Sequence, residues 1–186
     1  MKTFLNANAR AAPAFIFAAI LSFAVTFAML WSPPTATAQL TGTLSGPRFV
    51  ETAGVAGLFE IESSKLALER SKSPEIQKFA QEMVDDHTKI AADLKRAATS
   101  ANGDVPVPSA LDAEHEAMIR KLKAATGTDF DTLYVAMQTT AHEEAVGLFG
   151  AFAKDGDQTA LKSFAADTLP ILQKHLEHVR MIQLKT

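Results

Sequence analysis

The chain has 186 residues, of which 47% are hydrophobic and 21% are charged, with a formal net charge of -3 and no cysteine. These values favour one folded domain with appended segments and exclude a chain that is disordered throughout. The lack of cysteine excludes disulfides, thiolate metal sites and cysteine nucleophiles, and the acidic balance argues against nucleic-acid binding.

The first 38 residues resemble an export signal. Lys2 and Arg10 precede an uninterrupted apolar run over residues 14–31, and Ala-Thr-Ala at 36–38 is typical of a signal-peptide cleavage site. The apolar run is nearly long enough to span a bilayer, so an uncleaved inner-membrane anchor is the alternative. In either case we expect the rest of the chain in the periplasm, with no other membrane segment.

Residues 39–47 are small and polar, and we expect them to form a linker. The pattern after them is helical to the end of the chain, and no alternating run indicates a strand. Four long helices and one short helix are expected over about residues 48–71, 74–101, 112–126, 128–154 and 158–184.

Capping signals support these boundaries. Ser73 and Pro74 are typical of an N-cap and of the first helical residue after it. Gly103 and Gly127 stand where glycine commonly ends a helix, here the second and the third. Thr128 resembles the start of a capping box that opens the fourth helix.

The order of these helices predicts the fold class. Two helical hairpins joined by a connection with a short helix predict an all-α, ferritin-like four-helix bundle over residues 48–186, with the extra helix in the crossover. An up-down array of five helices is the alternative. Pro170 lies inside the last helix and predicts a kink near Thr168.

Each long helix carries one polar residue on or beside its inward face when it is drawn at about 100° per residue. Glu60 is centred on the inward face of the first helix, and His87 interrupts the apolar stripe of the second. His142 flanks the stripe of the fourth helix, and His175 lies near the centre of the stripe of the last. That last stripe is expected to comprise Leu161, Phe164, Thr168, Ile171, His175, Val179 and Ile182.

The heights of these residues along the bundle match well for one pair and less well for the other. Glu60 and His87 lie within about 3 Å of the same height, measured from the turn that joins their helices. His142 and His175 differ by about 7 Å before any kink is considered. The first pair is therefore expected to touch, whereas the second needs the kink or a longer turn.

Three imidazoles and a carboxylate suit Zn²⁺, Cu²⁺ or Ni²⁺, and helices in a bundle core hold such ligands rigidly. Glu60, His87, His142 and His175 are therefore the candidate metal ligands. The alternative is a structural network, in which Glu60 and His87 form a buried hydrogen-bonded pair and the other histidines bond to backbone or to Tyr134.

A di-iron site is less well supported. Di-iron bundles use Glu-x-x-His motifs, but the residues three before the histidines are Val84, Thr139 and Leu172. Di-iron chemistry is thus disfavoured.

Other polar residues near the candidates have simpler interpretations. A chelate of His175 with His178, three residues on, is a fallback site. Asp85 and Asp86 are better placed for solvent, and His115 is expected at the surface.

Several motifs in these helices resemble the exported bacterial family called domain of unknown function 4142. They are an acid in the first helix, M-V-x-D-H in the second, F-D-x-x-Y before a histidine in the fourth, and L-P-x-L-x-x-H in the last. The likeness spans about residues 49–181 and implies a ferritin-like fold and an envelope location, without an established activity. The motifs fall on Glu60, His87, Asp131 with Tyr134 and His142, and Pro170 with His175.

The sequence thus predicts a periplasmic metal-binding bundle for storage, buffering or protection. The alternative is a non-enzymatic envelope or stress-related protein whose buried His/Glu network is structural. No catalytic residue is assigned, and an enzyme ranks lowest because no open coordination position is visible from sequence. No feature identifies a protein partner, and a homo-oligomer is left open.

Overall fold

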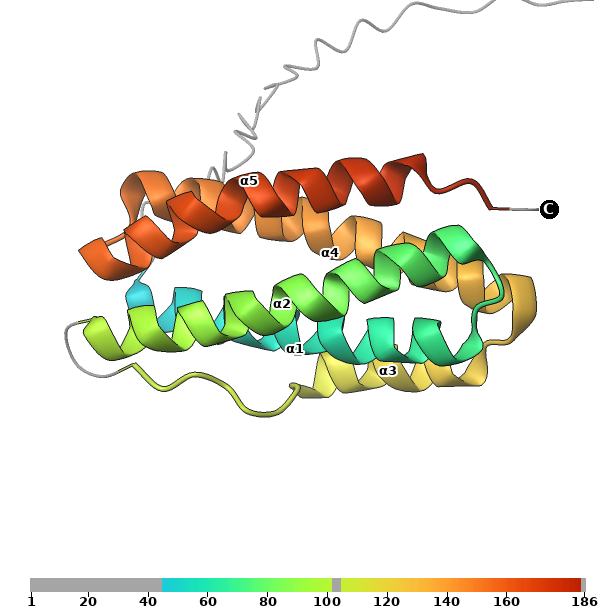
Figure 1. Cartoon of the computed structure of the whole chain (residues 1–186). Helices are drawn as coiled ribbons and strands as arrows, with labels where there is room; N and C mark the ends of the chain where they lie inside the picture. The colour runs from blue at the N-terminus through green and yellow to red at the C-terminus, as the bar shows by residue number, and fades with distance from the viewer. Residues whose placement is uncertain (1–44, 102–104, 185–186) are drawn as a thin grey trace, which may run out of the picture. The chain divides into compact units, whose positions relative to one another are not determined.

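The computed structural model describes residues 45–101 and 105–184, and in these ranges it contains five α-helices and no strand (Figure 1). The predicted signal segment, most of the predicted linker and Gly103 lie outside these residues. No helix within them is both long enough and apolar enough to cross a membrane. The helices are α1 (Gly46–Arg70), α2 (Pro74–Ser100), α3 (Ala113–Ala124), α4 (Gly127–Asp155) and α5 (Thr159–Met181).

The start of α2 follows directly from its sequence. Ser73 is the N-cap, and its side chain accepts a hydrogen bond from the Ile76 amide at 3.5 Å. Pro74 occupies the first helical position, where its missing N–H leaves no intrahelical bond unmade. The prediction of this cap is confirmed.

The passage from α3 to α4 differs from the sequence prediction. Gly127 is the first residue of α4 instead of the residue that ends α3, which stops at Ala124. Gly127 has a φ of +57°, a conformation that favours glycine and lets the chain turn sharply into α4. Thr128 therefore lies inside the first turn of α4 and does not precede it, so the predicted capping box is wrong.

The helices pack as two neighbouring pairs, α1 with α2 and α4 with α5 (Figure 1). Contacts of α2 with α5 and of α1 with α4 join the pairs, and α3 lies along α1. The all-helical class is confirmed. Each of the four long helices therefore turns one face toward a shared interior.

This interior contains two apolar clusters, which are separated along the helices by polar residues. On α2 one cluster ends at Met83 and the other begins at Leu94, and on α4 the corresponding residues are Met137 and Ala145. The candidate histidines of α2 and α4 fall within these intervals. The bundle core is thus divided by a polar layer.

Candidate metal centre

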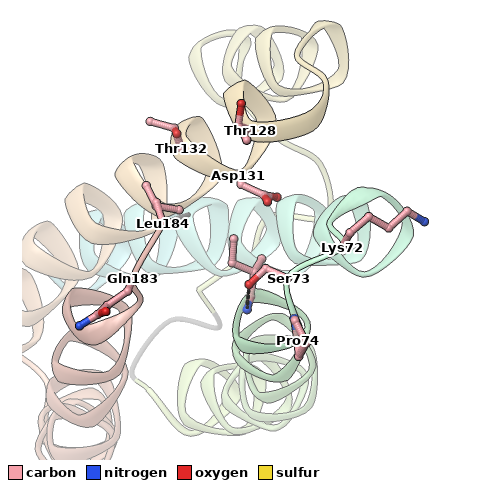
Figure 2. A pocket seen from close by; sticks show the side chains of 9 residues that line it. Lys72, Ser73, Pro74, Thr128, Asp131, Thr132, Gln183 and Leu184 are labelled. Atoms are coloured by element: carbon pink, nitrogen blue, oxygen red, sulfur yellow. Dashed lines mark hydrogen bonds between the residues drawn. The ribbon is translucent and has the colours of Figure 1, made fainter. Parts of the chain in front are cut away.

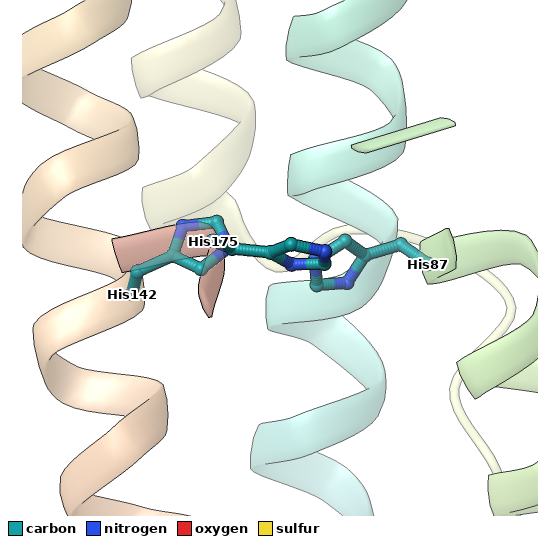
Figure 3. A group of neighbouring side chains, drawn as sticks. All are labelled: His87, His142 and His175. Carbon is teal, nitrogen blue, oxygen red and sulfur yellow. The ribbon is translucent and has the colours of Figure 1, made fainter. Parts of the chain in front are cut away.

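Three buried imidazoles point toward one another at the centre of this polar layer (Figure 3). His87 comes from α2, His142 from α4 and His175 from α5, with 2%, 0% and 1% of each residue exposed. One potential ligand atom of each lies within 4.8 Å of the other two. We refer to these three residues as the triad.

The outward nitrogen of each imidazole has a partner of its own. His87 Nδ1 lies 2.9 Å from Glu60 Oε2, and His175 Nε2 lies 3.1 Å from Asp86 Oδ2. His142 Nδ1 lies 2.9 Å from the backbone carbonyl oxygen of Gln138. A carbonyl and an ionised carboxylate only accept hydrogen bonds, so each of these outward nitrogens carries the ring's proton.

The inward nitrogens have no such partner. His87 Nε2, His142 Nε2 and His175 Nδ1 are buried and make no hydrogen bond within the described part of the chain. A neutral ring with its proton on the outward nitrogen carries a lone pair on its other nitrogen, and each triad member offers one potential ligand atom to the shared interior. Buried polar atoms without a partner are costly, and a metal ion bound to three lone pairs would remove that cost.

Burial keeps two of the imidazoles uncharged at neutral pH. Burial and, after it, the nearby His87 lower the pKa of His175 to about 4, against the opposing effect of the hydrogen bond to Asp86. Burial likewise lowers the pKa of His142, against the opposing charge of Glu60. Neutral imidazole is the form that binds a metal.

Glu60 is the counterpart of these imidazoles on α1. Burial alone raises the pKa of its carboxyl, but His87, His142 and His175 outweigh burial, so the pKa is lowered. Its Oε1 lies 3.3 Å from His142 Nδ1, so the carboxylate touches two of the three imidazoles from behind. The predicted contact between Glu60 and His87 is confirmed.

The structure also brings His142 and His175 together, with ring centroids 5.4 Å apart. His142 lies 13 residues before the end of α4, and His175 lies 16 residues after the start of α5. The difference of three residues corresponds to about 4.5 Å, less than the sequence-based boundaries implied. Long side chains on facing helices span that offset.

Two polar residues of the site were missed or misplaced by sequence reasoning. Asp86, expected to face solvent, has a side chain only 32% exposed and bonds to His175. The helical wheel could not find it because sequence alone does not show that α5 packs beside that edge of α2. Gln138 stands one turn before His142, and this spacing was a usable signal for a buried partner.

A second set of hydrogen bonds ties α1 to α4 beside the triad. Gln138 Nε2 donates to Ser63 Oγ at 2.9 Å, and Ser63 Oγ donates to the Phe59 carbonyl at 2.7 Å. The Ser64 and Tyr134 hydroxyls share a hydrogen bond of 2.8 Å. These bonds fix the part of α4 whose carbonyl orients His142.

The other two histidines lie outside the triad. His178 is half-buried, and its Nδ1 lies 2.7 Å from Glu82 Oε2. His115, predicted at the surface, is also half-buried, because its ring packs against Phe59 with centroids 5.4 Å apart.

A separate pocket of about 200 Å³ lies where α4 begins, near the connection between α1 and α2. Figure 2 shows Asp131 extending from α4 toward Lys72 and Ser73. Asp131 stands 11 residues before His142, or about 16 Å along α4. This pocket is therefore distinct from the triad, although Asp131 belongs to the family-like sequence motif.

Comparison with known proteins places the fold and the family. A solved structure described as CopM in the Cu(II)-bound form is similar, with a TM-score of 0.61 and 17% sequence identity, over 73% of this chain and 93% of that chain. At this identity the likeness concerns the fold. No curated protein sequence matches the chain. The family model described as Domain of unknown function (DUF4142) matches residues 32–182, and the chain therefore belongs to that family.

Proposed function

We propose that the protein binds one transition-metal ion through His87, His142 and His175. The observation that carries this proposal is the set of three buried, unpartnered imidazole nitrogens within the described residues. A structural network would be expected to satisfy these atoms, as it satisfies the outward nitrogens of the same rings. In metal sites, by contrast, each ligating histidine donates its other N–H to a carboxylate or carbonyl.

In this proposal Glu60 holds the histidines and does not bind the ion itself. Its carboxylate accepts from His87, approaches His142, and supplies negative charge near the incoming cation. Asp86 and the Gln138 carbonyl hold the remaining two rings. The four residues identified from sequence then act as three ligands and one positioning residue.

Copper or zinc is the metal that suits this donor set best. Three imidazole ligands favour Cu²⁺, Zn²⁺ or Ni²⁺ over hard cations that prefer oxygen. The similar fold of a protein solved with Cu(II) supports copper as the first ion to test. Bound there, the ion would be stored or buffered away from solvent, in a ferritin-like four-helix bundle located in the periplasm.

Metal analysis of protein purified without an affinity tag tests this function. We expect about one copper or zinc ion per chain after equilibration with the metal and removal of excess. His142→Leu should retain the helical circular dichroism spectrum and lose the ion. His115→Gln removes an imidazole outside the triad and is the matched control. A wild-type protein with no retained metal would refute the proposal.

A further inference from the structure

The outer side of His175 faces a second group of polar side chains, where α2 contacts α5. Glu82, Asp86 and His175 each place a potential ligand atom within 4.8 Å of the others. His178 adds a second imidazole, with its Nδ1 2.7 Å from Glu82 Oε2. The group therefore combines two carboxylates with two imidazoles.

Helix periodicity explains why these four residues meet. Glu82 and Asp86 are four residues apart on α2, and His175 and His178 are three apart on α5, so each pair shares one helix face. Phe79 packs edge-on against the His178 ring, with centroids 5.2 Å apart. The two pairs thus face each other across the contact between the helices.

This group connects the triad with solvent. The side chains of Glu82, Asp86 and His178 are 36%, 32% and 28% exposed, whereas that of His175 is 1% exposed. Among the triad members, only His175 has an outward partner that reaches water. The partner of His87 is the buried Glu60, and that of His142 is a backbone carbonyl.

We propose that Glu82, Asp86 and His175 form a capture site, where a divalent transition-metal ion is first bound before it moves to the triad. This inference rests on the metal-binding function proposed above. The two carboxylates attract a hydrated cation to this face. His175 belongs to both groups, so it can exchange one ligand nitrogen for the other.

The exchange at His175 conserves charge. To bind the ion through Nε2, the ring releases to the water around the ion the proton that it donates to Asp86, and water delivers a proton to Nδ1. When the ion moves to Nδ1, that proton returns to water, and water protonates Nε2 again. The ring is neutral in both states, and the hydrogen bond to Asp86 is restored after transfer.

The rate of Cu²⁺ uptake by the full chain tests this route. Glu82→Gln removes one carboxylate of the capture site without touching the triad. We expect copper uptake to be about three to ten times slower than in the wild type, as measured by stopped-flow absorption of the copper complex. Release should slow by the same factor, because a capture site alters the path and leaves the equilibrium affinity and the stoichiometry unchanged.

Glu143→Gln is the matched control. It removes the same charge from an exposed residue on α4 that pairs with Arg180, and it should keep the wild-type rate. Equal uptake rates in the two variants, with one copper bound per chain, would overturn the capture site and leave the triad intact. A weaker equilibrium affinity at an unchanged uptake rate would also overturn it, by placing Glu82 in the final site. A wild-type chain that binds neither copper nor zinc would overturn both proposals.

Discussion

At the scale of single residues, the arrangement depends most on Glu60. A buried carboxylate is costly unless it is paired, and here it lies 2.9 Å from His87 Nδ1 and 3.3 Å from His142 Nδ1. Its negative charge fixes the proton of His87 on the outward nitrogen. It also places one negative charge beside the triad, which favours a cation there.

Glu60→Leu should weaken both the fold and the metal site. The substitution leaves the outward N–H of His87 buried without an acceptor, which costs about 1–3 kcal/mol of unfolding free energy. Loss of a residue that orients a ligating histidine typically lowers metal affinity about 10–100-fold. Denaturant unfolding of the metal-free protein and competition with a metal chelator measure the two effects.

Two further variants are controls for that result. Glu60→Gln keeps an oxygen that can accept from His87, so it should lose less stability than the leucine variant. Glu62→Gln changes an exposed acid elsewhere on α1 and should leave both quantities unchanged. If Glu62→Gln and Glu60→Leu had the same effect, the role assigned to Glu60 would be wrong.

The stability of the metal-free protein should fall with acidification between pH 6.5 and about 4. The pKa of His175 is lowered from 6.5 to about 4 in the folded state, so in this interval the unfolded chain binds more protons. The resulting loss of unfolding free energy is absent above pH 6.5 and grows as the pH falls, with a limit of roughly 3 kcal/mol. His142 acts in the same direction.

Urea unfolding at a series of pH values, with chelator present, measures this dependence. His175→Leu should flatten the curve between pH 6.5 and 4, because the titrating imidazole is gone. A variant curve parallel to that of the wild type would show that other groups cause the acid sensitivity.

At the scale of helices, two glycines of α1 should respond in opposite ways to the same substitution. A Cβ at Gly57 would meet no atom within 4 Å outside its own helical surroundings, so Gly57→Ala should stabilise α1 by about 0.5–1 kcal/mol. A Cβ at Gly54 would lie 2.8 Å from Pro108 Cδ, so Gly54→Ala should be destabilising. Thermal unfolding of both variants measures this contrast, and equal shifts would contradict it.

Local signals explain which helix features could be predicted. Ser73 and Pro74 determine the start of α2 by themselves, because the cap and the proline act within one turn. Gly127 was ambiguous, because a glycine with positive φ serves equally well after one helix or at the start of another. Helix α5 continues through Pro170, and the kink expected near Thr168 stays a prediction.

Side-chain exposure on α5 shows where periodicity fails. Ile171 was expected in the inward stripe but is 37% exposed, whereas Leu172 is buried. Both positions lie near the edge of the stripe, so the packing of neighbouring helices decides between them. His87 and His175 were found because they lie nearer the centre of the inward faces, whereas His142 was placed only beside its stripe. Asp86 was missed because its burial depends on contact with another helix.

At the scale of the whole molecule, the polar layer interrupts what would otherwise be one continuous apolar core. One apolar cluster includes Phe49 and Phe152, and the other includes Phe79 and Tyr134. Replacing a buried polar network by apolar residues of similar size is often neutral or stabilising. Such a layer brings no gain in stability or lowers it, which the metal-binding role proposed above would account for, since functional sites commonly reduce stability.

A variant with leucine at all four positions, Glu60, His87, His142 and His175, tests whether the layer lowers stability. Without metal, it should be as stable as the wild type or about 1–4 kcal/mol more stable, because no buried polar atom of the four remains unpartnered. With metal at about 100 times the dissociation constant, the wild type should gain about 2.7 kcal/mol, and the variant should gain nothing. Denaturant unfolding with and without Cu²⁺ measures both. A variant that unfolds without a cooperative transition would instead show that the layer specifies helix packing, as the structural alternative requires.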